Sequence, residues 1–266
     1  ESLNINEWDD WHLAERELTP KLRVLFVANG DPKIGLGHVY RGIALWSAFA
    51  SRCDFIFLTQ QGATLGIELL NRQDVTVQVY DTTDDLLSIV SNIQPDIVIN
   101  DILDTSIRYI SSLKSKGIFV VNLEDLGDGS LEADIVINAL YDDLYLKPTH
   151  YVGPEYECLR QEFLESPIKD ISPDVNNILI TFGGIDSRNS TLQVLKALEG
   201  TITDEMTITI ILGLGYSYRD ELNATLSSYS ANVRVYNNVS RMSEHILNAD
   251  LIFTSAGRTV LEVMRQ

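Results

Sequence analysis

The chain has 266 residues and a formal net charge of −18, and 45% of its residues are hydrophobic. This apolar content is typical of globular proteins and argues against a disordered chain, and the length suits two domains of ordinary size or one large domain. The acidic balance argues against nucleic acid and anionic membrane surfaces as partners, because neutralising phosphate groups requires lysine and arginine.

Sequence features also predict the compartment. No apolar run approaches the roughly 18 consecutive residues of a membrane helix, so we expect no membrane partner. The first residues are acidic and amphipathic, unlike a signal peptide. Cys53 and Cys158 are expected to be free thiols in a reducing compartment. Together these features predict a cytoplasmic protein.

The first twenty residues differ from the rest of the chain. Trp8, Trp11 and Leu18 are spaced among acids as on one amphipathic helix over residues 7–18, which Pro20 would end. A helix this short is marginal in isolation and needs a surface to pack on. It either docks onto the following domain or is the tail of a preceding one.

After residue 20, apolar runs alternate with helical patterns. Strands are expected at residues 22–28, 54–59, 75–80, 97–100, 118–123 and 135–137. Helices are expected at residues 39–51, 63–71, 83–93 and 106–116. The runs lack strict polar alternation, which indicates strands covered on both faces of a mostly parallel sheet.

Residues 141–175 interrupt this alternation with four proline-containing turns and are interpreted as a loop-rich connection. The alternation then resumes. Strands are expected at residues 177–182, 206–212, 233–236 and 250–254, and helices at 190–199, 219–228, 242–248 and from 259 onward. We therefore predict an α/β protein with two Rossmann-like, doubly wound domains, residues 21–140 and 176–266, facing a cleft. The pattern stops inside a helix, so the second domain is expected to be incomplete.

A strand-to-helix turn at residues 34–41 is the first candidate site, since it carries Gly35, Gly37 and His38. Open α/β sheets bind ligands beyond the carboxyl ends of their strands, against exposed helix N–H groups. The turn is not a dinucleotide fingerprint, because Tyr40 stands at the third glycine position. A tight turn with an incidental histidine is the alternative.

Three further loops follow strands in the second half of the chain. Their candidate binding residues are Gly183, Gly184, Asp186, Asn189, Gly213, Ser255, Ala256, Gly257, Arg258, Thr259 and Glu262. Small residues before a helix would suit a diphosphate, and Glu262 could accept hydrogen bonds from ribose hydroxyls. Singly, each loop could be an ordinary turn, and Asp186 alone is more simply a helix cap.

Acids also follow strands in the first half: Asp101, Asp104, Glu124, Asp125 and Asp128. Asp101 could orient His38 or act as a base. Asp125 is a candidate on the same grounds as Asp101, whereas Asp104 and Asp128 are more simply surface acids. No histidine, cysteine and acid cluster has metal-ligand spacing, so neither a metal nor a cofactor is expected.

Four ordered motifs together resemble one family, the UDP-2,4-diacetamido-2,4,6-trideoxy-β-L-altropyranose hydrolases of pseudaminic acid biosynthesis and their spore coat polysaccharide relatives. The motifs are Ile34-Gly35-Leu36-Gly37-His38-Val39-Tyr40-Arg41; Gly153-Pro154-Glu155-Tyr156 with Leu159-Arg160 and Phe163; Phe182-Gly183-Gly184-Ile185-Asp186 with Asn189; and Ser255-Ala256-Gly257-Arg258-Thr259 with Glu262. The resemblance implies a GT-B fold, which is two Rossmann-like domains facing a cleft.

The activity that the resemblance implies is hydrolysis of a UDP-linked amino sugar to UDP and free sugar. His38 matches the family's catalytic histidine, and the turn with Gly35, Gly37 and Arg41 would face the sugar. The second-half loops match the UDP site, with Glu262 at the ribose. The family usually has tyrosine where this chain has Leu103, and serine or glycine where it has Arg258; these departures concern the sugar and diphosphate contacts.

A second, shorter resemblance covers residues 1–20. They look like the C-terminal end of an N-acylneuraminate (CMP-sialic acid) cytidylyltransferase, which implies a covalent fusion to such a domain. Two other functions stay open: a non-catalytic nucleotide-sugar-binding or scaffold domain of a CMP-sialic acid synthetase, and a GT-B glycosyltransferase.

Overall fold

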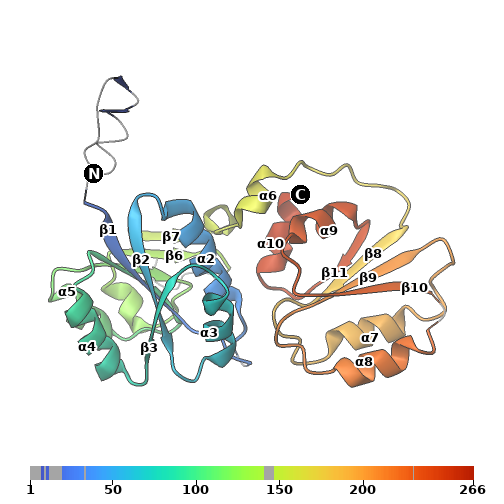
Figure 1. Ribbon diagram of the computed structural model, residues 1–266, viewed down its shortest axis with the longest axis horizontal. Helices are drawn as coiled ribbons and strands as arrows, with labels where there is room; N and C mark the ends of the chain where they lie inside the picture. The colour runs from blue at the N-terminus through green and yellow to red at the C-terminus, as the bar shows by residue number, and fades with distance from the viewer. Residues whose placement is uncertain (1–6, 9, 12–19, 33, 141–146, 230) are drawn as a thin grey trace.

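The computed structural model describes all residues except 1–6, 9, 12–19, 33, 141–146 and 230. It contains two α/β units that lie side by side and are joined through α6 (Gln161–Glu165) (Figure 1). Most of the helix expected at residues 7–18, and of the cytidylyltransferase-like segment, lies outside the described residues.

The first unit is built on a seven-stranded sheet with the order β3-β2-β1-β4-β5-β6-β7, in which every neighbouring pair is parallel. Its strands are β1 (Leu22–Ala28), β2 (Cys53–Gln60), β3 (Thr76–Tyr80), β4 (Ile97–Asp101), β5 (Phe119–Leu123), β6 (Ile135–Asn138) and β7 (His150–Val152). Its helices are α2 (Gly37–Phe49), α3 (Thr64–Asn71), α4 (Thr83–Ile93) and α5 (Ile107–Lys114). The predicted parallel α/β architecture is confirmed.

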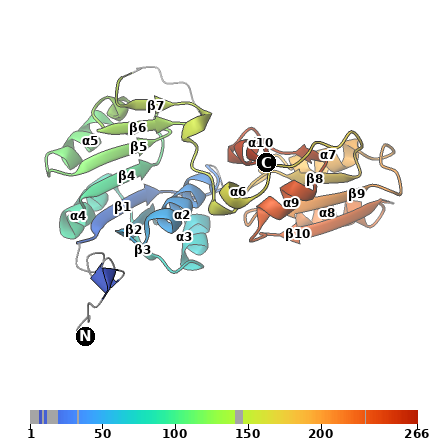
Figure 2. The same ribbon diagram turned by 90° about the horizontal axis from the view of Figure 1, so that it is seen from above.

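Two hydrophobic clusters cover the two faces of this sheet. Val24 and Phe26 pack with residues of α2 and α3, whereas Leu25 and Val27 pack with residues of α4 and α5. Successive side chains of a strand point to opposite faces, so β1 contributes to both clusters. Figures 1 and 2 show the two helix pairs on opposite sides of the sheet. Burial on both faces is the reason for the continuous apolar run in the sequence.

Strand β7 lies inside the segment that was expected to be a loop-rich connection. It pairs with β6 through Val136 and His150, Ile137 and Tyr151, and Asn138 and Val152. Three residues are too few for a periodic pattern, so the strand has no signature in the sequence. The sheet of the first unit consequently continues past residue 140, the boundary predicted for the domain.

The second unit has a four-stranded parallel sheet with the order β10-β9-β8-β11. Its strands are β8 (Asn177–Thr181), β9 (Thr207–Leu212), β10 (Asn232–Asn237) and β11 (Leu251–Phe253), and its helices are α7 (Ser190–Ala197), α8 (Arg219–Leu226), α9 (Met242–Asn248) and α10 (Arg258–Arg265). Helices α7 and α8 cover one face, and α9 and α10 cover the other.

The connection contributes to the core of the second unit. Phe163 of α6 is fully buried and packs with Leu179 of β8 and Met242 of α9. Short α6 and the 3-10 turn at Pro154–Tyr156 were not expected from the sequence. Because Phe163 is anchored in this core, the residues just before α6 are held close to α10.

Candidate active site

The two sheets reverse their strand order between β1 and β4 in the first unit and between β8 and β11 in the second. Open parallel sheets bind ligands beyond the carboxyl ends of their strands at such a point. The loop that precedes α2 contains Gly35, and the loop that precedes α10 contains Gly257. Both loops line one pocket of about 290 Å³ between the units.

Ten of the predicted site residues line this pocket: Gly35, Gly37, Gly183, Gly184, Gly213, Ser255, Gly257, Arg258, Thr259 and Glu262. Tyr40 and Arg160, which belong to the quoted motifs but were not predicted as site residues, line the pocket too, as does Asn238, which sequence reasoning missed. The Tyr40 hydroxyl donates a hydrogen bond to Oδ1 of Asn238 at 3.3 Å, which ties α2 to the loop after β10. Only the packing of the two units brings these residues together.

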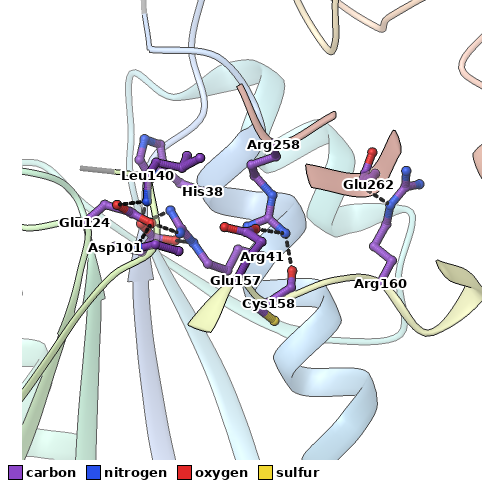
Figure 3. A network of polar contacts seen from close by, with 11 residues as sticks. His38, Arg41, Asp101, Glu124, Leu140, Glu157, Cys158, Arg160, Arg258 and Glu262 are labelled. Atoms are coloured by element: carbon purple, nitrogen blue, oxygen red, sulfur yellow. Dashed lines mark hydrogen bonds and ion pairs between the residues drawn. The ribbon is translucent and has the colours of Figure 1, made fainter. Parts of the chain in front are cut away.

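His38 lies in the first turn of α2, because the helix begins at Gly37 rather than at the predicted residue 39. The carbonyl of Leu36 already accepts a hydrogen bond from the Tyr40 N–H at 3.0 Å. Nδ1 of His38 lies 2.7 Å from Oδ1 of Asp101, the last residue of β4 (Figure 3). The predicted pairing of histidine and aspartate is thus present, although neither residue is among those lining the pocket.

Arg41, one turn further along α2, holds the same aspartate. Its Nε donates to Oδ2 of Asp101 at 2.7 Å and its Nη2 to Oδ1 at 3.1 Å. Its Nη1 donates to Oε1 of Glu124 at 2.9 Å. Arg41 is 4% exposed and does not line the pocket, so its predicted contact with substrate stays a prediction. In the structure, it fixes two carboxylates behind His38.

The charges of this cluster stabilise one another. Burial alone would raise the pKa of Asp101, but the charge of Arg41 and the hydrogen bond with His38 lower this pKa below its ordinary value. Burial would also lower the pKa of Arg41, yet Asp101 and Glu124 raise it above the ordinary value. The aspartate therefore stays ionised beside the imidazole and keeps Nδ1 occupied, which leaves Nε2 as the nitrogen for a ligand.

Glu124 is a member of this cluster that sequence reasoning grouped only with the acids after strands. It has φ 52°, an unusual backbone conformation for a residue other than glycine. Its carboxylate accepts hydrogen bonds from the N–H groups of Ala139 and Leu140 as well as from Arg41. By contrast, Asp125 accepts hydrogen bonds from the Thr105 hydroxyl and backbone, which is a structural role.

Two loops of the second unit meet backbone to backbone. Gly183, with φ 75°, turns the chain after β8. A Cβ on Gly213 would lie 2.3 Å from the carbonyl oxygen of Gly183 and 2.4 Å from that of Gly184. The N–H of Gly215 also donates to the Gly184 carbonyl at 2.9 Å. Glycine is required at Gly213 because the loops after β8 and β9 touch there.

The start of α10 supplies the side chains of the pocket's second wall. Arg258 donates a hydrogen bond to the carbonyl of Cys158 and forms an ion pair with Glu157, Nη2 to Oε1, at 3.0 Å (Figure 3). The arginine predicted for the diphosphate is thus held by the connection in this structure. Ala256 lies in the same loop but does not line the pocket.

The side chain of Glu157 is buried, with 2% of it exposed. Burial raises the pKa of Glu157 above its ordinary value, although Arg258 and then Arg41 act to lower it. Glu262, predicted at the ribose, is 5% exposed and accepts a hydrogen bond from Nε of Arg160 at 3.1 Å. Two pocket residues are therefore each paired with the segment that connects the units.

Two predicted binding residues support their own loop. Asp186 caps α7: its carboxylate oxygens accept hydrogen bonds from the N–H groups of Ser190 and Thr191, both at 2.8 Å. Oδ1 of Asn189 accepts a hydrogen bond from the Tyr216 hydroxyl at 2.8 Å. Neither Asp186 nor Asn189 lines the pocket, so a ligand contact for them stays a prediction.

Leu103 follows the catalytic candidate Asp101 by two positions and is half-buried. Its φ of 57° is in the left-handed region, which costs a residue with a Cβ about 1 kcal/mol or more. The side chain does not line the pocket. The departure from the family's tyrosine thus changes a strained loop close to the His38–Asp101 pair.

Within the part of the chain that the structure describes, no group of three or more His, Cys, Asp or Glu residues is arranged to hold a metal ion. In the same residues, no helix combines the length and apolarity that crossing a membrane requires.

The fold and the paired switch points define the protein as an α/β protein with the GT-B fold, as the resemblance implied. Acinetobacter baumannii MurG superposes with a TM-score of 0.64 over 92% of this chain and 76% of that chain, at 18% identity. The spinosyn forosaminyltransferase SpnP has a TM-score of 0.57 over 92% and 77%, at 14% identity. LpCGTa in complex with UDP has a TM-score of 0.54 over 92% of this chain and 77% of that chain, at 13% identity.

Two curated proteins are similar in sequence. The uncharacterized protein MJ1062 of Methanocaldococcus jannaschii is 32% identical over 263 residues, which is 91% of this chain and 54% of that protein. The spore coat polysaccharide biosynthesis protein SpsG of Bacillus subtilis is 26% identical over 188 residues, 67% of this chain and 55% of that protein. The chain thus spans about half the length of these curated relatives. No protein-family model matches the chain.

Proposed function

We propose that this protein is an enzyme that breaks the bond between C1 of a sugar and the diphosphate of a UDP-sugar. The observation that carries the proposal is the His38–Asp101 pair, which stands directly beside a pocket whose opposite wall holds glycine-rich loops and Glu262. A base and a nucleotide-sized, partly polar pocket facing each other suit a displacement at the sugar.

The chemistry needs one proton acceptor and one site for the leaving group. An O–H group attacks C1, its proton passes to Nε2 of His38, and the C1–O bond breaks to release UDP. Asp101 stabilises the imidazolium that forms, because its carboxylate is 2.7 Å from Nδ1. The N–H groups at the start of α10 and the loop at Gly183 would stabilise the charge of the departing diphosphate.

The nucleophile is best taken as an acceptor hydroxyl, which makes the protein a glycosyltransferase. Support comes from the fold, because SpnP, which has the same fold, is named a forosaminyltransferase. The name of SpsG supports a place in polysaccharide biosynthesis. The four motifs of the hydrolase family favour a second candidate, in which water takes the place of the acceptor.

One observation favours water specifically. The His38 side chain is 13% exposed and lies behind the residues lining the pocket, so there is little open surface beside the base. A small nucleophile reaches such a site more easily than a sugar or lipid hydroxyl does. The hydrolase would act on a UDP-linked amino sugar, as the motif resemblance implies.

UDP release from a panel of UDP-sugars tests the proposal, with and without candidate acceptors. Release that requires an acceptor identifies the transferase, and equal release without one identifies the hydrolase. His38→Gln should lower kcat by about 10²–10⁴-fold. His245→Gln is the matched control, because His245 lies on α9 against Tyr236 and outside the pocket. Full activity of the His38 variant would reject His38 as the base. UDP binding without turnover of any sugar would reject the enzyme in favour of a binding domain.

A fusion to a cytidylyltransferase stays a proposal for the whole protein. It is supported by the resemblance of residues 1–20 and by the greater length of the two curated relatives. Assaying the full-length protein for CMP-sugar formation from CTP tests it. Absence of that activity in a protein that still releases UDP would reject the fusion partner but not the UDP-sugar reaction.

A further inference from the structure

Arg160 lies in the segment that connects the two units, and it lines the pocket. It contacts Glu262 of α10, which lies 102 positions later in the chain. Arg160 is the residue just before α6, and its Nε donates a hydrogen bond to Oε1 of Glu262 at 3.1 Å. Both residues line the same pocket. Figure 3 shows the arginine approaching Glu262 from the connection, on the side away from His38.

The guanidinium of Arg160 is held on several sides. Nη1 forms an ion pair with Glu162 at 2.7 Å. The guanidinium carbon lies 4.8 Å from the ring centroid of Phe163 and 6.0 Å from that of Tyr40. Phe163 is itself fully buried in the core of the second unit. These contacts restrict the arginine to one geometry before any ligand binds.

Glu262 has one oxygen engaged and one available. Among the described residues, only Arg160 donates a hydrogen bond to it, and the bond goes to Oε1. The side chain is 7% exposed, and it borders the pocket one turn into α10. Oε2 therefore remains an acceptor that a ligand hydroxyl can use.

A carboxylate in a pocket for a diphosphate needs a counter-charge. Without one, the like charges of Glu262 and the ligand would repel each other across a partly desolvated space. Arg160 supplies that charge, and its hydrogen bond to Oε1 fixes the direction of Oε2. Arg258, the other arginine lining the pocket, is engaged by Glu157 and the Cys158 carbonyl instead.

We propose that Arg160 is the positioning residue for ribose recognition: it neutralises Glu262 and holds Oε1, so that Oε2 accepts hydrogen bonds from the ribose hydroxyls of a bound uridine diphosphate. This inference rests on the proposed function and deepens it by assigning a residue of the connection to nucleotide selectivity. The expected consequence is a preference for ribonucleotides over deoxyribonucleotides.

The test is isothermal titration calorimetry of the 266-residue chain with UDP, 2′-deoxy-UDP and 3′-deoxy-UDP. Loss of a hydrogen bond to a charged group should weaken binding of at least one deoxynucleotide about tenfold or more in the wild type. In Arg160→Ala the ratio of the affinity for UDP to that for the deoxynucleotide should fall towards one. Arg160→Lys should restore part of this preference. Glu262→Gln should show the same reduced ratio. The double variant with Arg160→Ala and Glu262→Gln should resemble Glu262→Gln alone.

If the role of Arg160 were merely structural, Arg160→Ala would weaken the binding of all three nucleotides equally and leave the ratio of affinities unchanged. Arg241→Ala is the matched control, because it removes the exposed ion pair with Glu244 on α9. Thermal unfolding checks that each variant is folded, and Arg160→Lys replaces the alanine variant if that one is not.

Each outcome has one meaning. A wild-type protein that binds no uridine nucleotide rejects the proposed function and this inference with it. A wild type that binds UDP and both deoxynucleotides equally rejects ribose recognition by Glu262. A wild-type preference that survives in Arg160→Ala and Arg160→Lys overturns the role of Arg160 alone.

Discussion

Nδ1 of His38 in the first turn of α2 lies 2.7 Å from Oδ1 of Asp101 at the end of β4, two residues that are 63 positions apart in the chain. β1 and β4 are neighbours in the sheet, with Ala28 paired to Asp101, so the strand order itself places the aspartate beneath the helix that follows β1. The pair is therefore built into the fold at the switch point of the first sheet.

Asp101→Asn is expected to lower kcat by about 10²–10⁴-fold. An amide can donate to Nδ1 and so favour the tautomer that carries its proton on Nε2, where it cannot accept the nucleophile's proton. Steady-state UDP release measures the effect, and thermal unfolding checks the fold. The same substitution at exposed Asp104 is the control and should leave kcat unchanged. A wild-type rate for Asp101→Asn alongside an inactive His38→Gln would show that the carboxylate does not act through the imidazole.

Arg258→Ser, which introduces a residue usual in the resembling family, should destabilise this protein by about 3–5 kcal/mol at neutral pH. The substitution leaves the buried carboxylate of Glu157 without its cation. Adding Glu157→Gln should recover much of the loss, which urea unfolding of both single variants and the double variant measures.

The penalty of Arg258→Ser should also depend on pH. Burial already raises the pKa of Glu157, and removing Arg258 removes the largest opposing influence. Without Arg258, it is the ionised form of Glu157 that costs stability. The loss of stability should therefore be small below pH 4.5, the ordinary pKa of a glutamate, and should grow as pH rises above that value. A loss of stability that is the same at acidic and neutral pH would contradict this account of the pair.

Gly213→Ala should disturb the nucleotide side of the pocket. The new Cβ would lie 2.3 Å and 2.4 Å from two carbonyl oxygens of the loop after β8, so one of the loops must move. We expect a cost in stability of about 1–3 kcal/mol and weaker UDP binding, measured by thermal unfolding and calorimetry. Gly62→Ala is the control, since its Cβ would meet no atom within 4 Å. Unchanged affinity for UDP in the Gly213 variant would remove this loop from the binding site.

Asp250→Asn tests how the sheet of the second unit is held. The Asp250 carboxylate accepts hydrogen bonds from the N–H groups of Asn176 and Asn177 and from Lys169, linking the start of β11 to that of β8. Burial acts to raise the pKa of Asp250, but these hydrogen bonds and the charge of Lys169 lower it to about 2.

Because the pKa of Asp250 is lower in the folded protein, its ionised form stabilises the fold at pH values above 3.8, the pKa in the unfolded chain. This stabilisation is lost as pH falls towards about 2. Asp250→Asn should therefore cost about 1–2 kcal/mol at pH 7, and the difference from wild type should vanish over that acidic window. Unfolding by urea at a series of pH values measures it, with exposed Asp204→Asn as the control. A pH-independent difference would exclude ionisation as the cause.

Much of the fold was predictable because it depends on local patterns. Strand β1 and the helices α4 and α9 have the bounds expected from apolar runs and helical spacing. The turn with Gly35 and His38 was recognisable because it combines glycines with a strand-to-helix transition. β7 and α6 were not predictable, since three and five residues are too short for a periodic signal.

The sequence by itself determined the α/β class, the two repeating units and the glycine-bearing loops that end their strands, because these follow from periodicity and backbone freedom. Only the tertiary structure decided which distant side chains meet: Asp101 and Arg41 behind His38, Arg258 on Glu157, and Arg160 on Glu262. The physical reason is that strand order and the packing of α6 into the second core set these distances, and neither leaves a mark on the local pattern of residues.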